Sequence, residues 1–478
     1  MKKEGYITIY LSLTVAVMLS FIVTLIEGIR VQTIRFQTEC VMDMGITSIF
    51  AEYNRELLKQ YGLLAIDTSY GFADADDERT KSHLLQYMNM NFTAPGQTRL
   101  PNYKDLTAIH ADNADLSRIS YLSDNEGEIL KYQILKYMKE KNGLSYAEEI
   151  LSAVSFEDAD EKYRELEDKK DSSHGQIDEI LEELNAQRTE EEEEISIDNP
   201  ADYVEGMKKS ILLELAVKDS GSILRNKVTL SDYISHRGYE EGCGLWSNQN
   251  PPDGAVNYLL FQQYLFDKCG WYGDLKNNSA LGYQLEYILY GNDNDFDNLD
   301  DFASQLFKVR YVINAAYLFG CSAKVNEAGT LAAAVTAGIG SPQLMEAVKI
   351  TILFAWCYAE TIQDLRIVFD GKGVAEYKSD STWNIPLSEL LMFTASLDSY
   401  HAVENGKTYK DYLAGFLFVK KEKTVRMRLM DIMEMDIRRS AGNQYFQMDT
   451  CIYQLMAEVN ISSKYGYGYS IARDYSYE

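Results

Sequence analysis

A long apolar segment near the start of the chain limits every architecture that the rest can adopt. Residues 6–26 form 21 consecutive positions without a charged residue, a proline or a glycine. A helix rises 1.5 Å per residue, so this segment would be roughly 31 Å long, enough to cross the hydrocarbon core of a bilayer. We therefore predict a transmembrane helix over residues 6–27. The alternative is a cleaved signal peptide, whose apolar region is usually shorter, about 7–15 residues, and ends in a small-x-small site that residues 24–30 do not offer.

The residues before the apolar segment predict its orientation. Lys2 and Lys3 lie in the short tail formed by residues 1–5. Positive residues favour the cytoplasmic side of a membrane, so the tail should be cytoplasmic and the bulk of the chain extracytoplasmic. The predicted location is the cell membrane, where lipid is the partner of residues 6–27.

Apolar residues continue beyond the membrane segment, mostly three or four positions apart, with polar residues between them. This spacing is typical of an amphipathic helix. The first proline is Pro95, so we predict one helix from about residue 6 to about residue 61, with an amphipathic stalk over residues 28–62.

The apolar stripe of this stalk needs a covering surface, because a lone amphipathic helix is poorly stable in water. One interpretation is that the protein's own head covers the whole stripe. The other is that the membrane-proximal part stays open for another helix. In that case Ile34, Val41 and Met44 would form the helix-assembly face.

The exterior part of the chain divides by composition into three segments. Residues 63–120 start an α+β head, residues 121–225 form a charged helical insertion, and residues 226–478 hold most of the large apolar segments. Aromatic residues alternate with glycine or serine from Tyr465 to Ile471, which predicts a half-buried strand. The predicted fold class is α+β, with a long N-terminal helix, a mostly helical exterior region and a smaller β-sheet.

Three stretches of the sequence resemble known families. The start, Lys3 to Leu13, looks like the start of the pilin-like proteins of tight-adherence (Tad) pili, in which a glycine precedes the hydrophobic segment. Ala51 to Asp67 (AEYNRELLKQYGLLAID), and Trp356 to Arg366 (WCYAETIQDLR) with the GKGV that follows, are similar to an uncharacterised membrane-anchored family of Gram-positive bacteria. That family is associated with Tad-type pilus and secretion systems. The resemblance implies a hydrophobic N-terminal helix whose second half packs under a globular head.

The same resemblance locates a possible processing site between Gly5 and Tyr6. Type IV pilin-like sites usually carry a glutamate five residues after the glycine, and that position is Tyr10 here. In pilins this glutamate neutralises the new amino terminus of a neighbouring subunit. The departure predicts inefficient or absent cleavage after Gly5, and it argues against a major, polymerising subunit.

Composition excludes several classes of partner. The chain has 73 acidic and 46 basic residues, for a net charge of −27. Nucleic-acid phosphates are met by lysine and arginine, so this balance disfavours nucleic acid. It also disfavours electrostatic docking to anionic lipid.

No motif in the sequence predicts an enzyme. The five histidines form no H-x-x-x-H pattern, and there is no G-x-S-x-G elbow, Walker A loop or kinase signature set. We therefore predict no catalytic residue, metal site or cofactor, and we identify no small-molecule substrate. The acidic segment 291–301 has the rhythm of a calcium loop but lacks its glycine and its final glutamate. The other interpretation is a helix cap by Asp297 or Asn298.

The six cysteines are too few and too scattered for a disulfide-built scaffold. Cys321 and Cys357 lie in apolar helical contexts and are predicted to be buried thiols. Cys243 and Cys269 flank one loop, and a disulfide between them is possible in an oxidising exterior.

These observations favour a non-enzymatic, single-pass, membrane-anchored, pseudopilin-like envelope protein that assists a Tad-type pilus or secretion apparatus. Pilin-like or secretion-apparatus proteins are its predicted partners. The alternative is an extracytoplasmic ligand-binding or sensory domain on a simple membrane anchor.

Overall fold

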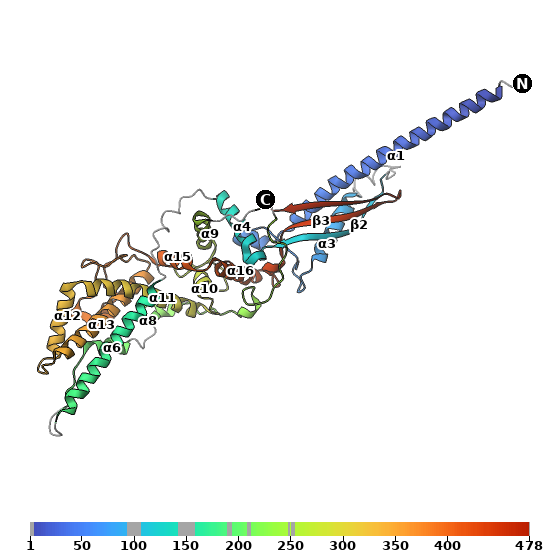
Figure 1. The fold of residues 1–478 in the computed structure, drawn as a ribbon. Helices are drawn as coiled ribbons and strands as arrows, with labels where there is room; N and C mark the ends of the chain where they lie inside the picture. The colour runs from blue at the N-terminus through green and yellow to red at the C-terminus, as the bar shows by residue number, and fades with distance from the viewer. Residues whose placement is uncertain are drawn as a thin grey trace. The chain divides into compact units, whose positions relative to one another are not determined.

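The computed structural model describes residues 4–92, 107–141, 158–188, 194–207, 212–246, 249 and 254–477. The chain is 61% helix and 10% strand, which confirms the predicted α+β class. It forms two compact units (Figure 1). The sheet unit comprises Met1–Glu140, Ser231–Pro252 and Met433–Glu478, and the helical unit comprises Lys141–Leu230 and Asp253–Ile432. The predicted segments followed sequence order, whereas the sheet unit gathers both ends of the chain.

A small antiparallel sheet forms the core of the sheet unit. Strand β3 (Cys451–Ser463) is central, and β2 (Ile109–Tyr121) pairs along one of its edges. Strand β4 (Gly468–Ser476) and the short β1 (Ile66–Asp67) pair with the other edge. The predicted C-terminal strand is therefore present, but Tyr465 and Tyr467 lie before it, in the turn that joins β3 to β4.

The second half of helix α1 (Glu4–Phe50) packs against this unit, where α3 (Asp77–Phe92) and β4 contact it. The ring of Phe50 lies 4.5 Å from that of Tyr475 on β4. Gly45 permits a close approach of α3, because a side chain at this position would clash with Met88. The residues predicted as a stalk are therefore part of the head itself.

The predicted continuous helix to residue 61 is interrupted. Helix α1 ends at Phe50, and a separate helix, α2 (Arg55–Tyr61), follows. The side chain of Asn54 accepts hydrogen bonds from the backbone N–H groups of Glu56 and Leu57, which caps α2 and fixes the break. Gly62, in the left-handed region at φ 73°, ends α2.

Asn54 should contribute measurably to stability, because its amide also donates to Asp67 at 3.3 Å and to Asn443 at 2.8 Å. We expect Asn54→Ala to lower the free energy of unfolding by about 1–2 kcal/mol in urea titrations of the detergent-solubilised chain. Asn54→Ser keeps a capping acceptor but loses the amide donor, so its loss should be smaller. An unchanged unfolding midpoint for Asn54→Ala would show that the break does not depend on this cap.

The remaining helices belong to the helical unit or extend the sheet unit. The sheet unit contains α4 (Asp124–Lys141, whose last residue belongs to the helical unit), and α16 (Glu422–Arg438) supplies residues to both units. The helical unit contains α6 (Ala159–Ala186), α7 (Pro200–Met207), α8 (Leu212–Ala216), α9 (Ala255–Lys268), α10 (Gln284–Tyr290), α11 (Asp295–Gly320), α12 (Ser322–Val335), α13 (Pro342–Phe369), α14 (Phe393–Ser396) and α15 (Tyr409–Val419). Short 3₁₀ helices cover Ser220–Ser222, Leu230–Asp232, Leu387–Met392 and Met448–Thr450.

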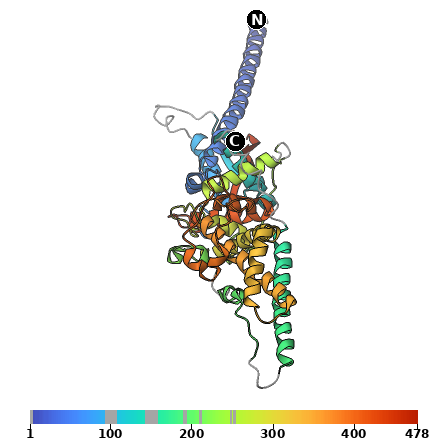
Figure 2. The ribbon, with the colours of Figure 1, turned by 90° about the vertical axis from the view of Figure 1, so that its left-hand side faces the viewer.

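Helix α13 is the core of the helical unit. Every side chain from Thr351 to Phe369 is buried, because α6, α7, α8, α11 and α12 contact this helix from several sides. Figure 2 shows α6 in green beside the orange α12 and α13. Within the described residues, α1 is the one helix long and apolar enough to cross a membrane. The apolar run 350–358, which is too short for a second membrane span, lies inside α13.

Candidate functional site

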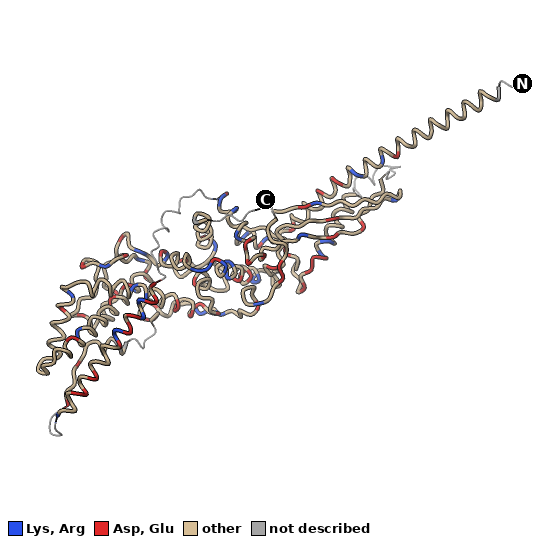
Figure 3. The backbone as a smooth tube through the Cα atoms, viewed as in Figure 1, with Lys and Arg blue, Asp and Glu red and all other residues tan. Residues whose placement is uncertain are grey.

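The first half of α1 exposes apolar side chains along its whole length. Residues 6–26 include no charged residue, and the tube view draws this part of the helix in tan (Figure 3). No part of its most apolar stretch is buried by the rest of the chain. Leaving this much apolar surface in water is unfavourable by roughly 25 cal/mol per Å². The segment is therefore suited to act as a membrane anchor.

The second half of α1 has two different faces. Ile34 and Val41 are only 4% and 2% exposed, because they face the sheet unit. Phe36 is 70% exposed, Ile29 67% and Met44 46%. Of the three residues predicted as a helix-assembly face, Met44 alone is therefore at the surface.

We define the outward face of α1 as Ile29, Thr33, Phe36, Cys40 and Met44, all of which are exposed. They are three or four positions apart, so they share one side of the helix. The spacing of the outward face is visible in the sequence, but so is the spacing of the other apolar stripe, which contains Ile34 and Val41. Only the folded structure shows which of the two stripes the sheet covers and which one is exposed.

A balanced cluster of charged side chains is fully buried in the helical unit. Asp364 accepts hydrogen bonds from Arg310 at 2.8 and 3.0 Å, from Lys378 at 2.7 Å and from Asn314 at 2.9 Å. Lys378 also donates to Glu360 at 2.5 Å. The two cations are Arg310 on α11 and Lys378 in the segment after α13. They face the two carboxylates of α13, Glu360 and Asp364.

The pKa values in this cluster follow from its contacts. Burial acts to raise the pKa of Asp364, but the adjacent Arg310 and Lys378 outweigh it and lower that pKa. Burial raises the pKa of Glu360, against the opposing effect of Lys378. Because every charge is matched within the chain, this arrangement is suited to holding α11 and α13 together. This structural role also explains why Glu360 and Asp364 occur in the stretch Trp356–Arg366, which resembles the uncharacterised membrane-anchored family.

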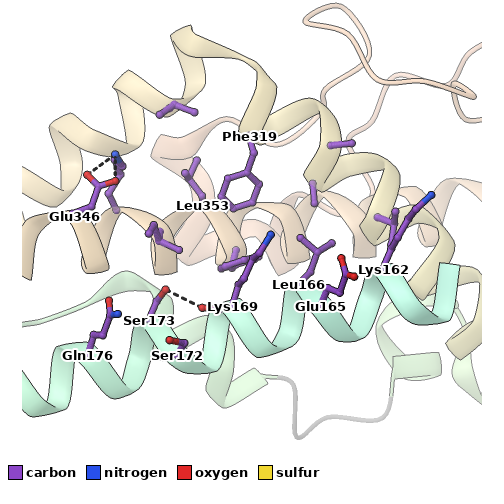
Figure 4. Close-up of a pocket in the computed structure, with 17 residues that line it drawn as sticks. Lys162, Glu165, Leu166, Lys169, Ser172, Ser173, Gln176, Phe319, Glu346 and Leu353 are labelled. Atoms are coloured by element: carbon purple, nitrogen blue, oxygen red, sulfur yellow. Dashed lines mark hydrogen bonds and ion pairs between the residues drawn. The ribbon is translucent and has the colours of Figure 1, made fainter. Parts of the chain in front are cut away.

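A groove of about 740 Å³ lies between α6, α11, α12 and α13 in the helical unit (Figure 4). Its wall is mostly apolar, and Phe319 and Leu353 point into it. Lys162 and Lys169 of α6 line it as well. The volume is within the range of small-ligand sites, so this groove is a candidate for a binding pocket.

A protein-family model described as "Family of unknown function (DUF5702)" matches residues 190–463, more than half of the chain. The chain belongs to the DUF5702 family. Comparisons with curated proteins and with solved structures find no match. The DUF5702 range includes α11, α13 and β3, whereas α1 and α6 precede it. The buried charge cluster therefore lies in the DUF5702 range, and the outward face of α1 lies outside it.

The acidic segment 291–301 of the DUF5702 range starts helix α11. Its N-cap is Asn294, whose side chain accepts the backbone N–H of Asp297, so the predicted caps at Asp297 or Asn298 are wrong by three or four positions. The Asn298 side chain instead bonds the backbone of Asn292 and Asn294. No group of three or more metal-ligating side chains occurs among the residues that the structure describes.

The remaining predicted site residues are dispersed. Cys243 is exposed in the sheet unit and Cys269 is buried in the helical unit, and the structure forms no disulfide between them. Cys357 is buried as predicted, whereas Cys321 is partly exposed. Gly5 and Tyr6 lie in the first turn of α1. The segment 93–106, whose Pro95, Gly96 and Pro101 are residue types typical of turns, and most of the acidic run 190–194 lie outside the described residues.

Proposed function

We propose that this DUF5702 protein is a non-enzymatic, single-pass envelope protein that assists a Tad-type pilus or secretion apparatus. Residues 6–27 anchor it, residues 1–5 are cytoplasmic and the bulk of the chain is extracytoplasmic. The outward face of α1 then packs against the apolar helix of a pilin-like partner. The observation that carries the proposal is the exposure of Phe36, a large aromatic side chain ten residues beyond the apolar segment.

Three further features support this assignment. The second half of α1 packs on the sheet unit by one side, which agrees with the helix packing under a globular head that the resemblance to pilins implies, and its other side is exposed. The outward face continues directly from the membrane segment, so a partner helix could follow it from the bilayer into the exterior without interruption. Ile29, Phe36 and Met44 offer apolar contact area, and small residues, Thr33 and Cys40, lie between them.

Substitution of Phe36 tests the proposal. Phe36→Glu places a charge in the proposed helix–helix contact, so we expect recovery of pilin-like partners after mild cross-linking of whole cells to fall about tenfold, equivalent to about 1.4 kcal/mol. Because Phe36 is exposed, the melting temperature of the purified protein should not change.

Met90→Glu is the matched control, because Met90 is an exposed apolar residue on α3 of the same unit. It should leave partner recovery unchanged. Equal recovery of partners with Phe36→Glu and Met90→Glu would show that the outward face is not the assembly surface.

The groove in the helical unit favours a second candidate function, an extracytoplasmic ligand-binding or sensory domain on a simple anchor. Its mostly apolar walls suit an apolar ligand, because the lysines that line the groove are accompanied by Glu165 and Glu346. Leu353→Trp would fill the groove. If this change abolishes activity in cells while Phe36→Glu does not, the sensory function is the better account.

A further inference from the structure

The turn between β3 and β4 is a rigid, aromatic hairpin tip. Its three loop residues are Lys464, Tyr465 and Gly466, and Gly466 lies in the left-handed region at φ 84°. The backbone N–H of Gly466 donates to Ser463 at 2.9 Å, and that of Ser463 donates to Tyr467 at 2.8 Å. A glycine in this conformation closes a common three-residue hairpin loop. We call residues 464–467 the tip.

The tip is fixed to α1 at the point where the apolar segment ends. The guanidinium of Arg30 lies over the ring of Tyr465, 4.1 Å from its centre. Arg30 also pairs with Glu27 at 2.6 Å, and the hydroxyl of Tyr467 donates to the same carboxylate. The tip is therefore level with the first helical turn beyond Ile26.

A second attachment holds the tip from the sheet side. The backbone N–H of Lys464 donates to the carbonyl of Ala108 at 3.1 Å, and the Ser463 hydroxyl donates to the carbonyl of Thr107. Two elements thus hold the tip, α1 and the segment that leads into β2. Its height along α1 is set by the fold of the sheet unit.

We propose that this tip is seated in the headgroup layer of the extracytoplasmic leaflet, so that the sheet unit rests directly on the bilayer. This inference rests on the proposed anchoring by residues 6–27. If the bilayer covers the helix up to Ile26, a group bonded to Glu27 lies at the membrane–water boundary. Tyrosine rings are favoured at this depth because the ring is apolar and the hydroxyl is polar.

The residues of the tip suit a lipid surface, although the net charge of the whole chain does not. The net charge of −27 disfavours electrostatic docking of the protein as a body. At the tip, however, Lys464 and Tyr465 are both exposed, and the guanidinium of Arg30 lies over the Tyr465 ring. A lysine at this level reaches lipid phosphates while its stem remains in the less polar layer.

Seating the tip in the headgroups has a consequence for assembly. The tip binds the sheet-facing side of α1, through Glu27 and Arg30, and the outward face lies on the opposite side of the helix. The contact would therefore hold the head at the membrane without covering Ile29 or Phe36. A partner helix would meet the outward face immediately above the bilayer.

Spin-label accessibility measures the depth of the tip. The full chain, with Cys40, Cys243 and Cys321 changed to serine, is placed in nanodiscs of phosphatidylcholine and phosphatidylglycerol, and one nitroxide is attached at Lys464→Cys. Oxygen concentrates in lipid and a nickel chelate stays in water. We expect oxygen to relax the label at 464 more strongly, and nickel less strongly, than a label at Asp474→Cys, an exposed position on β4 that lies away from the tip.

Two outcomes separate this inference from the proposed anchoring. A label at Ala16→Cys, in the middle of the apolar segment, reports whether α1 enters the bilayer. If the label at 16 is lipid-exposed while those at 464 and 474 are equally relaxed by nickel, anchoring holds and the seating of the tip is overturned. If the label at 16 is accessible to nickel, the anchoring itself fails, and this inference fails with it.

Discussion

Replacing Asp364 with alanine should lower the free energy of unfolding of the helical unit by about 3–5 kcal/mol. The carboxylate accepts four hydrogen bonds, from Arg310, Lys378 and Asn314, and all of these side chains are buried. Its removal leaves two buried cations facing one carboxylate, Glu360. The unmatched charge accounts for most of the expected loss, because a buried ion is stable in a protein only when it is paired.

The measurement uses urea unfolding followed by tryptophan fluorescence in a Trp246→Phe background. The other three tryptophans, Trp271, Trp356 and Trp383, belong to the helical unit, so the signal reports on that unit alone. Asp398→Ala is the matched control. Asp398 also pairs with an arginine, Arg366, at 2.9 Å, but its side chain is half exposed, so the expected loss is below about 1 kcal/mol.

A double variant separates charge from packing. Arg310→Met combined with Asp364→Leu removes one cation and one anion together, and it leaves Lys378 paired with Glu360. Its loss of stability should be smaller than the sum of the losses caused by the two single changes. Additive losses would indicate that the cluster contributes through packing alone, and that the charge argument is wrong.

Changing Glu286 to glutamine should alter how the stability of the helical unit depends on pH. Glu286 is fully buried on α10, where its carboxylate accepts the Tyr409 hydroxyl at 2.6 Å and the backbone N–H of Tyr272 at 3.0 Å. Burial raises its pKa from the usual 4.5 to about 7. Between these two values the folded chain holds a proton that the unfolded chain has released.

The sign of the effect follows from this difference in protonation. Where the folded state binds more protons than the unfolded state, stability falls as pH rises. The contribution of Glu286 therefore decreases from about pH 4.5 to about pH 7 and is constant above that. A pKa difference of this size corresponds to about 3 kcal/mol. Relative to wild type, Glu286→Gln should gain up to that amount over this window.

The exposed Glu389→Gln is the control for the loss of one carboxylate in the same unit. Urea unfolding at a series of pH values between 4 and 8, read by the same tryptophans, gives the free energy for each variant. Parallel pH profiles for wild type and Glu286→Gln would mean that Glu286 has the same pKa in the folded and unfolded states. The assignment of a raised pKa would then be wrong.

The sequence was sufficient to predict features that depend on neighbouring residues. The apolar run 6–26 predicted the first half of α1 because length and the absence of charge are local properties. The break before α2 was missed, although Asn54 is a favourable capping residue. The apolar spacing continues across the break because both helices pack on the same unit, so periodicity alone could not locate it.

Features that depend on distant residues could not be predicted. Arg310 and Lys378 are separated by 68 positions, and their convergence on Asp364 appears only when α11 and α13 pack together. Tyr465 and Tyr467 followed the alternation of a strand, but Gly466 adopts a left-handed turn and α1 fixes the rings. The choice between Ile34 and Phe36 as the exposed side of α1 required knowledge of where the sheet lies.

The most direct test of the proposed assembly is photo-cross-linking from position 36 in intact cells. A photoreactive phenylalanine analogue replaces Phe36 in one strain and the buried Ile34 in a matched control. We expect position 36 to give a covalent product with a second protein that itself begins with an apolar helix, identified by mass spectrometry. Position 34 should give only products within its own chain. Products at position 36 with lipid alone, or with its own chain alone, would contradict the account.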